Sequence, residues 1–548
     1  MNPARSWRVA SADSGRHVFR AVSAVKPATL PTASAPSTPI SRRVSISRLH
    51  GRGATIPAGI LRPARRRGDG IRRAKPASAA GGGAGGRRAA SFRRAALDFF
   101  RAAFILPAMK PMGWTCWLAA GALAASVLSP AAVPSRPNVV LIMADDFGYE
   151  CVGANGCADY QTPHLDRLAA GGMRFEHCHV QPLCTPTRVQ LMTGLYNVRN
   201  YTRFGELRPE ERTFAHVFKA AGYVSGIAGK WQLGHDPGLP RHFGFDESCL
   251  WQHTRRPPRY ANPGLEYNGV PKDFTHGEYG PELVNDWARD FIRRHRHEPF
   301  LLYYPMILTH APYQPTPDSP DWDPTARGEK VHQHPRHFGE MVAYADKMIG
   351  RLVATLEELG LRERTLVIFL GDNGTGRGVR TRMRDGRVIV GGKGSPTPAG
   401  THVPLIANWP GVIPAGRVCG DLVDSTDFFP TICEAAGLRP PENPALDGRS
   451  FWPQLQGRPG NPREWTYCWF ARDGGAKAQH EFAATKRYKL YRDGRFYDDW
   501  ADPEEKRPLD PDSDPALARV RDRLQAVLDA FQDARPTEVA ARGGRNRN

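Results

Sequence analysis

The sequence predicts an α/β fold with a large, mostly parallel central sheet flanked by helices, and a smaller C-terminal antiparallel sheet plus a helix. Two observations support this prediction. Between residues 138 and 437, continuous apolar runs alternate with segments of helical periodicity, the pattern of a parallel sheet covered by helices. From about residue 440 onward, short strand-like segments and an Asp-Gly turn indicate antiparallel strands instead.

The elements of the first region follow in order along the chain. The strand 138–144 (Asn-Val-Val-Leu-Ile-Met-Ala) has no charged residue and is suited to burial on both faces of a sheet. The long helix 338–359 ends at Gly360, a residue typical of helix C-termini. The other expected strands are 223–228, 300–304, 365–370 and 405–408, and the other expected helices are 163–171, 213–221, 281–295 and 425–436.

The C-terminal region is expected to form four short strands, with Asp493-Gly494 as a hairpin turn, followed by an amphipathic helix at 515–531. These strands are 465–470, 482–484, 488–491 and 496–497. We therefore predict an α/β domain over residues 134–440, a subdomain of small sheet and helix over 441–535, and a polar tail over 536–548.

The N-terminal part has a different composition. The chain has 75 Lys and Arg against 55 Asp and Glu, a formal net charge of +20, which by itself would suggest a nucleic-acid partner. Residues 1–108 carry 21 of the basic residues and three of the acidic ones, so the rest of the chain is nearly neutral. We therefore expect no nucleic acid as partner. We interpret 1–108 as a basic low-complexity leader that is disordered, or that precedes a true start at Met109 or Met112.

Residues 109–133 have the layout of a secretory signal peptide. A short basic start is followed by an apolar stretch, 114–127, and then by small residues at 129–132. An uncleaved membrane anchor is the alternative, but the Ala, Gly and Pro content makes this run only mildly hydrophobic. We predict an exported protein, periplasmic or secreted, with no stable membrane span after signal cleavage.

Nine cysteines are present, and none has the spacing of a zinc finger. In an exported protein some of them could form disulfides, for example Cys419 with Cys433, although the sequence does not fix the pairing.

Two pairs of oxygen-bearing side chains follow two of the expected strands. Asp145-Asp146 come directly after the first strand, and Asp372-Asn373 come after the strand that begins at residue 365. Open α/β sheets place ligands at the carboxyl ends of their strands, and oxygen ligands suit a hard divalent cation. The two pairs together predict one Ca²⁺ or Mg²⁺ site, whereas either pair alone could be a solvated turn or an Asx turn.

Cys184 begins the run Cys-Thr-Pro-Thr-Arg and opens a helical stretch, 187–192. A helix N-terminus favours negative charge, so an anionic nucleophile or a bound oxyanion would be stabilised there. Arg188 lies one turn into this helix and can approach both the nucleophile and the metal ligands. The alternative is a buried structural cysteine.

Three further residues stand in short polar or glycine-rich segments that follow strands. They are Lys230 in Gly-Lys-Trp-Gln-Leu-Gly, His310 in Thr-His-Ala-Pro, and Lys393 in Gly-Gly-Lys-Gly-Ser. The lysines could oppose the charge of a bound anion, and the histidine could transfer a proton. Taken singly, each lysine would be a solvated residue, and His310 is one of 18 histidines.

Together these blocks resemble the type I, formylglycine-dependent sulfatases of the alkaline-phosphatase-like superfamily. The resemblance covers residues 136–510, and the blocks occur in the order found in that family. It also includes the segments 162–168, 427–431, 446–450 and 496–504.

The resemblance implies an arylsulfatase-like sulfuric ester hydrolase in which a separate maturation enzyme oxidises Cys184 to formylglycine. Lys230 and Lys393 would bind the sulfate oxygens, His310 would contact the substrate and protonate the leaving alcohol, and Arg188 would favour the alkoxide at residue 184. The implied ligands of Ca²⁺, with Mg²⁺ as the alternative, are Asp145, Asp146, Asp372, Asn373 and the residue at position 184.

Two departures from the family pattern stand out. Gln232 occupies the position of a histidine that usually contacts the hydrated aldehyde during sulfate release. Since glutamine cannot act as a base near neutral pH, we hypothesise that Gln232 only positions the diol, or that another group such as His235 assists. The segment 397–404 lacks the Glu and Arg common in the family, so the loop that carries Lys393 is expected to need other support.

The implied substrate is a sulfated small molecule or a sulfated glycan. A basic and aromatic insert could hold a polyanionic glycan through charge-assisted and cation–π contacts, or it could be a solvated surface loop. Its residues are Trp251, His253, Arg255, Arg256 and Arg259. Two other functions stay open: a phosphonate monoester or phosphodiester hydrolase of the same superfamily, and a non-catalytic relative that binds sulfated glycans.

Overall fold

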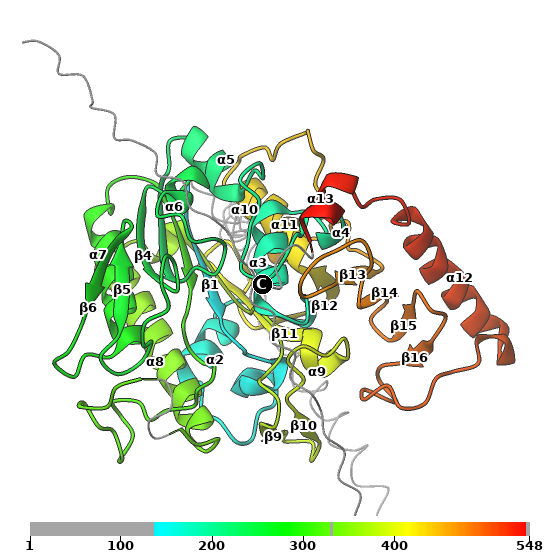
Figure 1. The fold of residues 1–548 in the computed structure, drawn as a ribbon, viewed down its shortest axis with the longest axis horizontal. Helices are drawn as coiled ribbons and strands as arrows, with labels where there is room; N and C mark the ends of the chain where they lie inside the picture. Colours follow the sequence, from blue (N-terminus) through cyan, green and yellow to red (C-terminus); the bar gives the residue numbers. More distant parts are fainter. Residues whose placement is uncertain (1–135, 329–332, 544–548) are drawn as a thin grey trace, which may run out of the picture. The chain divides into compact units, whose positions relative to one another are not determined.

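A sheet of ten strands organises residues 136–328 and 333–543, the part of the chain that the computed structural model describes (Figure 1). Its strand order is β12-β2-β11-β8-β1-β7-β3-β4-β5-β6. The strands are β1 (Asn138–Ala144), β2 (Met173–His179), β3 (Val224–Lys230), β4 (Glu247–Trp251), β5 (Gly264–Tyr267), β6 (Val270–Asp273), β7 (Phe300–Pro305), β8 (Thr365–Gly371), β11 (His402–Asn408) and β12 (Arg417–Asp424). The expected leader, 1–108, and signal peptide, 109–133, lie outside the described residues.

Most neighbouring strands of this sheet run parallel. Strand β1 pairs in parallel with both β7 and β8, and β7 with β3. Strand β11 is antiparallel to β8 and β2, and β4, β5 and β6 form an antiparallel edge. The predicted fold class is confirmed, with a mixed rather than uniformly parallel sheet.

Helices cover both faces of the sheet. Alternate side chains of β1 enter two different apolar cores, because successive residues of a strand point to opposite faces. Val139 and Leu141 belong to the core shared with α3, α5 and α10, whereas Val140 and Ile142 belong to the core shared with α2, α7 and α8. The longer helices are α2 (Pro163–Ala170), α3 (Cys184–Thr193), α5 (Phe214–Ala220), α7 (Gly280–Arg294), α8 (His337–Glu358), α10 (Phe428–Ala435) and α12 (Pro515–Ala530).

Short helices and turns connect these elements. They are η1 (Tyr149–Cys151), η2 (Gly153–Asn155), α4 (Asn197–Asn200), α6 (Leu239–His242), η3 (Arg362–Arg364), α9 (Pro398–Thr401), η4 (Ser425–Asp427), α11 (Trp452–Leu455), η5 (Pro511–Ser513) and α13 (Thr537–Arg542). A two-stranded ribbon, β9 (Arg380–Arg382) with β10 (Val388–Val390), precedes the loop that carries Lys393. Helix α13 lies in the segment that we expected to be a polar tail.

The C-terminal region forms the expected antiparallel sheet. Its strands are β13 (Thr466–Phe470), β14 (His480–Ala484), β15 (Tyr488–Tyr491) and β16 (Phe496–Asp498), in this order. Tyr467, Leu490 and Leu524 of this sheet and of α12 belong to the same apolar core as Val139 of β1. The small sheet therefore packs directly on one face of the α/β part.

Some strands have no counterpart in the sequence prediction, namely β2, β4, β5, β6 and β12. Strand β3 was expected to end at residue 228 but runs to Lys230, because β4 pairs with it as far as Lys230 and Trp251. The expected helix 425–436 begins as the separate 3-10 turn η4.

The cysteines of the described residues do not form disulfides. All eight are free thiols, so the pairing of Cys419 with Cys433 that we considered is wrong.

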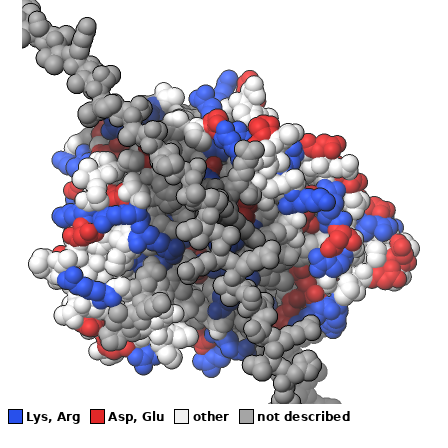
Figure 2. Space-filling view, viewed as in Figure 1, with Lys and Arg blue, Asp and Glu red and all other residues white. Residues whose placement is uncertain are grey.

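Basic and acidic side chains are interspersed on the face of the molecule shown in Figure 2. This distribution agrees with the near balance of charge beyond residue 108 in the sequence.

Candidate active site

The two predicted pairs of oxygen ligands meet at the carboxyl edge of the central sheet. Strands β1 and β8 are parallel neighbours that pair up to Ala144 and Gly371, so the residues after them lie side by side. The backbone N–H of Asp146 donates to Oδ1 of Asp372 at 3.0 Å. All four side chains of the two pairs are buried, so this edge of the sheet gathers buried polar and charged groups.

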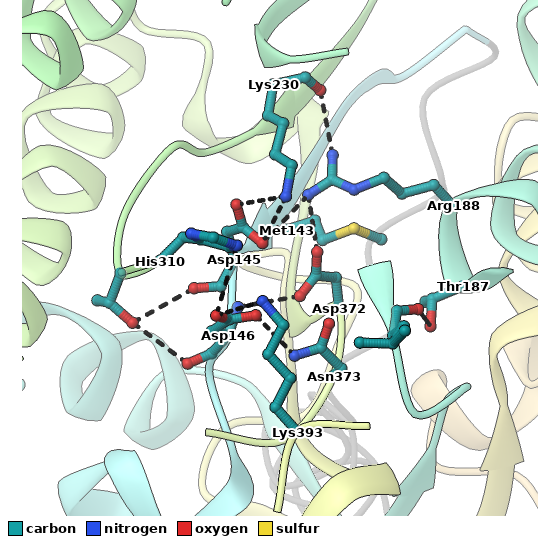
Figure 3. Close-up of polar contacts among 12 residues, drawn as sticks. Met143, Asp145, Asp146, Thr187, Arg188, Lys230, His310, Asp372, Asn373 and Lys393 are labelled. Atoms are coloured by element: carbon teal, nitrogen blue, oxygen red, sulfur yellow. Dashed lines mark hydrogen bonds and ion pairs between the residues drawn. The ribbon is translucent and has the colours of Figure 1, made fainter. Parts of the chain in front are cut away.

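Each aspartate of the first pair holds a different lysine. Lys230, the last residue of β3, places Nζ 3.0 and 2.8 Å from the two carboxylate oxygens of Asp145. Lys393, in the loop between β10 and α9, places Nζ 2.7 Å from Oδ2 of Asp146. Figure 3 shows the two lysines extending toward the aspartates from opposite sides.

Arg188 connects helix α3 to the second pair. Its Nη2 donates to Oδ2 of Asp372 at 2.8 Å and lies 3.9 Å from Oδ1 of Asp145. Its Nη1 donates to the backbone oxygen of Lys230 at 3.1 Å. The guanidinium is thus fixed between three strands' ends, and its charge faces both pairs (Figure 3).

Cys184 is the first residue of α3 and is 1% exposed. Its Sγ and one carboxylate oxygen from each of Asp145 and Asp372 all lie within 4.8 Å of one another. Burial raises the pKa of the thiol, and Lys230 acts in the opposite direction. The structure therefore brings Cys184 next to an aspartate of each predicted pair of oxygen ligands, at the helix N-terminus where the sequence placed it.

His310 reaches the same group of residues from the segment after β7. Its Nε2 lies 3.8 Å from Oδ2 of Asp146. The hydroxyl of the preceding Thr309 lies 3.3 Å from the backbone oxygens of both Asp145 and Asp146, which ties this segment to the end of β1. Burial lowers the pKa of His310 to about 4, although Asp146 and Asp145 act to raise it.

Burial and the neighbouring positive charges have opposite effects on the pKa of each aspartate, and the balance differs between Asp145 and Asp372. Burial raises the pKa of Asp145, but the cationic side chains, Lys230 first, outweigh burial and hold this pKa well below its usual range. At Asp372, burial and the repulsion of Asp145 prevail over Arg188 and raise the pKa to about 7. Burial is thus the main reason for the raised pKa of Asp372, which holds its proton more strongly than Asp145 does.

The oxygen donors fit a hard divalent cation. Nδ2 of Asn373 donates to Oδ1 of Asp146 at 2.8 Å and to the backbone oxygen of Gly374 at 2.9 Å. Oδ1 of Asn373 is then buried without a hydrogen-bond partner in the described part of the chain. A buried polar atom without a partner is costly, and a cation would supply one. With the three aspartates, this oxygen forms a donor set that Ca²⁺ or Mg²⁺ prefers.

Gln232 follows β3 two residues after Lys230, with φ of 54° and 8% exposure. Its Oε1 is buried and has no hydrogen-bond partner within residues 136–328 and 333–543. The ring of His235 is held by the backbone, since its Nδ1 lies 2.7 Å from the oxygen of His253. Of the two residues in the hypotheses about sulfate release, Gln232 thus has a buried amide oxygen without a partner in the described residues, and His235 is bound to the backbone of His253.

Backbone contacts support the loop that carries Lys393. The backbone N–H of Lys393 donates to the backbone oxygen of Thr375 at 3.0 Å, and the N–H of Gly394 donates to the backbone oxygen of Pro182 at 2.8 Å. The guanidinium of Arg377 donates through Nε to the oxygen of Lys393 at 2.8 Å. These contacts supply the support that the segment 397–404 was expected to lack.

Three of the five residues of the basic and aromatic insert are buried, whereas Arg256 is exposed. Trp251, His253 and Arg259 are at most 2% exposed, so the interpretation of these three as a glycan-gripping surface is wrong. Arg255 is partly exposed and donates to Asp273 through both terminal nitrogens. The insert folds inward because strands β4 and β5 pair on either side of it.

Thr375 is a residue that the sequence analysis missed. Its hydroxyl accepts from the N–H of Gly148 at 3.1 Å and lies 2.5 Å from Oε1 of Glu150. Because its backbone oxygen also accepts from Lys393, it joins the turn after β1 to the loop after β10. The signal was its place, directly after Gly-Asp-Asn-Gly.

Two family models match the chain. A model described as "Sulfatase" matches residues 137–438, which is more than half of the chain. A model described as "N-sulphoglucosamine sulphohydrolase, C-terminal" matches residues 398–534. The two matches together span the ten-stranded sheet and the C-terminal sheet.

Several curated proteins are similar in sequence. N-acetylgalactosamine-6-sulfatase of Canis lupus familiaris is 33% identical over 385 residues, which cover 64% of this chain and 71% of that protein. Arylsulfatase A of Bos taurus is 34% identical over 396 residues, which cover 65% of this chain and 74% of that protein.

Solved structures share the fold. Ps i-CgsB aligns with a TM-score of 0.61 and 24% identity, over 73% of this chain and 94% of that one. Phosphonate monoester hydrolase of Agrobacterium radiobacter aligns with a TM-score of 0.54 and 21% identity, over 74% of this chain and 97% of that one. At these identities the likeness concerns the fold alone.

Proposed function

Because the chain belongs to the sulfatase family and is a sulfuric ester hydrolase, we propose that it hydrolyses the sulfate ester of a saccharide at residue 184, after conversion of Cys184 to formylglycine. The observation that carries this proposal is the placement of Cys184. Its Sγ lies within 4.8 Å of carboxylate oxygens of Asp145 and Asp372, which in turn bind Lys230 and Arg188.

A divalent cation is part of the proposal, with Ca²⁺ first and Mg²⁺ as the alternative. When bound, it would supply positive charge opposite the reacting ester and would favour the deprotonated nucleophile. The buried Oδ1 of Asn373 without a partner supports this assignment. The residues that would hold the cation are Asp145, Asp146, Asp372, Asn373 and the modified residue 184.

The three positive side chains differ in how deeply they are buried. Lys230 and Arg188 have side chains that are 0% and 1% exposed, whereas that of Lys393 is 19% exposed. We assign Lys393 to first contact with the sulfate group and the two deeper cations to charge stabilisation at its reacting centre. Their contacts with the aspartates fix them before the substrate arrives, so little reorganisation is needed.

His310 shares the open side of the site with Lys393. Its side chain is 20% exposed, and its Nε2 is on the side of Asp146. We assign it to the leaving group, where a hydrogen from Nε2 would stabilise the departing alcohol oxygen. Gln232 is assigned to positioning, since its amide can donate and accept hydrogen bonds but is not a base.

A saccharide substrate is supported by the relatives rather than by a contact in this chain. One relative is named N-acetylgalactosamine-6-sulfatase, and Ps i-CgsB has also been crystallised in complex with k-i-k-neocarrahexaose. A sulfated monosaccharide or oligosaccharide is therefore the substrate class that we propose to test first.

The test is to produce the protein together with a formylglycine-generating enzyme, as we propose for its maturation, and to analyse the peptide that contains residue 184 by mass spectrometry. Loss of the thiol and gain of an aldehyde should accompany sulfate release from N-acetylgalactosamine 6-sulfate and from an aryl sulfate. Cys184→Ala should release no sulfate. If matured protein cleaved a phenyl phosphonate monoester but no sulfate ester, the hydrolase would act on phosphonates and the proposal would be wrong.

Export is a separate proposal that rests on the signal layout of residues 109–133. Among residues 136–328 and 333–543, no helix combines the length and the apolar character needed to cross a membrane. N-terminal sequencing of the protein recovered outside the cytoplasm should give a first residue close to 134, and an intact residue 109 would contradict cleavage.

A further inference from the structure

Arg259 contacts the ring of His310, although it lies outside the set of residues assigned above. Its Nη1 is 2.8 Å from Nδ1 of His310, and the residue is 2% exposed. The guanidinium carbon lies 4.2 Å from the centroid of the Trp251 ring. A guanidinium over an indole face is held by cation–π attraction and by stacking, so this side chain is fixed in position.

We propose that Arg259 is a positioning residue for the reaction: it orients the ring of His310 so that Nε2 carries the proton and faces the ester. This inference rests on the function proposed above. A guanidinium N–H can only donate, so Nδ1 of His310 accepts. A neutral imidazole that accepts at Nδ1 has its proton on Nε2, the nitrogen 3.8 Å from Asp146.

A second contact would favour the other tautomer of His310, in which Nδ1 carries the proton. The backbone oxygen of Ala311 also lies close to Nδ1 of His310, and a carbonyl oxygen can only accept. If Nδ1 carried the proton, its N–H would face the N–H groups of the buried Arg259 guanidinium, and the two donors would repel each other. The charge-assisted contact from Arg259 is the stronger of the two, so it decides the tautomer.

The neighbouring residue holds the other end of the histidine. The hydroxyl of Tyr260 donates to the backbone oxygen of His310, and Nε1 of Trp251 donates to Pro257 at 3.0 Å. Two consecutive residues thus hold His310: Arg259 contacts its ring, and Tyr260 binds its backbone oxygen. In this proposal, the insert that the sequence suggested as a glycan surface orients the histidine that donates a hydrogen bond to the ester.

The role predicts a dependence on the leaving group. A poor leaving group, such as a saccharide alkoxide, depends on a hydrogen bond to its oxygen as negative charge develops there, and a neutral His310 can donate that bond from Nε2 without losing its proton. Nitrophenolate departs without such help. Loss of Arg259 should therefore slow saccharide sulfates much more than nitrophenyl sulfate. A residue that only gripped a glycan would change KM, and one that only stabilised the fold would slow all substrates equally.

The experiment uses Arg259→Met, which keeps an apolar chain over Trp251 but has no donor, and Arg259→Lys, which keeps a donor and the charge. With the matured, Ca²⁺-loaded protein, kcat of Arg259→Met should fall on the order of 100-fold for a saccharide sulfate and by less than about threefold for nitrophenyl sulfate. Arg259→Lys should recover part of the loss. Arg535→Met is the matched control, because it removes a guanidinium stacked on Trp469 at 3.9 Å outside the site.

Two results would overturn the inference. One is an equal loss for both substrates, or a change in KM alone. The other is a spectroscopic result: two-bond ¹⁵N–¹H correlation in ¹⁵N-histidine-labelled protein, with His310 identified from His310→Asn, should show the Nε2-protonated tautomer. An Nδ1-protonated ring in the unsubstituted protein would contradict the role of Arg259 even if no sulfate were released, and absence of sulfate release would contradict only the proposed function.

Discussion

Lys230→Met should destabilise the cation-free protein by about 3–5 kcal/mol, the range for breaking a buried ion pair. The side chains of Lys230 and Asp145 are both 0% exposed, and Nζ lies 2.8 Å from Oδ2. At that distance the attraction is about 6 kcal/mol for an effective dielectric constant of about 20. Arg188 remains 3.9 Å away but already binds Asp372. Proton uptake by the unpaired carboxylate recovers part of the loss, which leaves the smaller net value.

Urea unfolding followed by circular dichroism, in EDTA near pH 7.5, measures this loss. Lys219→Met is the control, because Lys219 binds Asp246 at 2.6 Å but their side chains are 45% and 32% exposed. An exposed pair of this kind should contribute less than about 1 kcal/mol. Added CaCl₂ should stabilise Lys230→Met more than the unsubstituted protein, since the cation replaces the missing positive charge. A loss no larger than that of the control would refute the reasoning.

Three further changes test other parts of the molecule. Asn373→Ala should weaken Ca²⁺ binding at least about tenfold in calorimetric titration of EDTA-stripped protein, and unchanged affinity would remove Asn373 from the ligand set. Burial lowers the pKa of His402, which stacks on Tyr149, to about 4. The unfolded chain therefore binds more protons below pH 6.5, and stability should fall by up to about 3 kcal/mol as the pH drops from about 6.5 to about 4. His402→Gln should flatten that part of the curve of urea midpoint against pH, and an unchanged slope would be evidence against the assignment. Arg463→Met should cost about 3–5 kcal/mol because Nε donates to Asp427 at 2.7 Å in a buried pair, and a melting temperature within about a degree of the unsubstituted protein would contradict this.

The fold was predictable where local pattern and burial agree. Strands β1 and β8 are buried on both faces and have continuous apolar sequences, so the prediction placed them within a residue of their observed bounds. Strand β2, Met-Arg-Phe-Glu-His-Cys-His, alternates between buried and more exposed residues and contains charges, so it did not meet the criterion of a continuous run. Its position depends on pairing with β11 and β12, which lie more than 200 residues further along the chain.

The site was predictable as a set of residues but not as a set of contacts. Short motifs named Lys230 and Lys393, yet nothing local says that one lysine binds Asp145 and the other Asp146. For the insert around Arg259, the sequence predicted an exposed surface where the structure has a buried arginine. Arginine in a polar segment is usually solvated, whereas this one lies between the paired strands β4 and β5 in the chain and contacts His310.

The contacts of the site join residues that are far apart in the sequence. Lys230 binds a partner 85 positions away, Arg188 one that is 184 positions away, and Lys393 one that is 247 positions away. Closing such long loops is slow, so the site is completed late in folding. A cation that binds only this completed arrangement would stabilise the whole α/β part, by about 4 kcal/mol at a free concentration 1,000 times its Kd. Bound calcium would then stabilise the arrangement in which these distant segments meet. Its removal would lower the free energy of unfolding of all of them together.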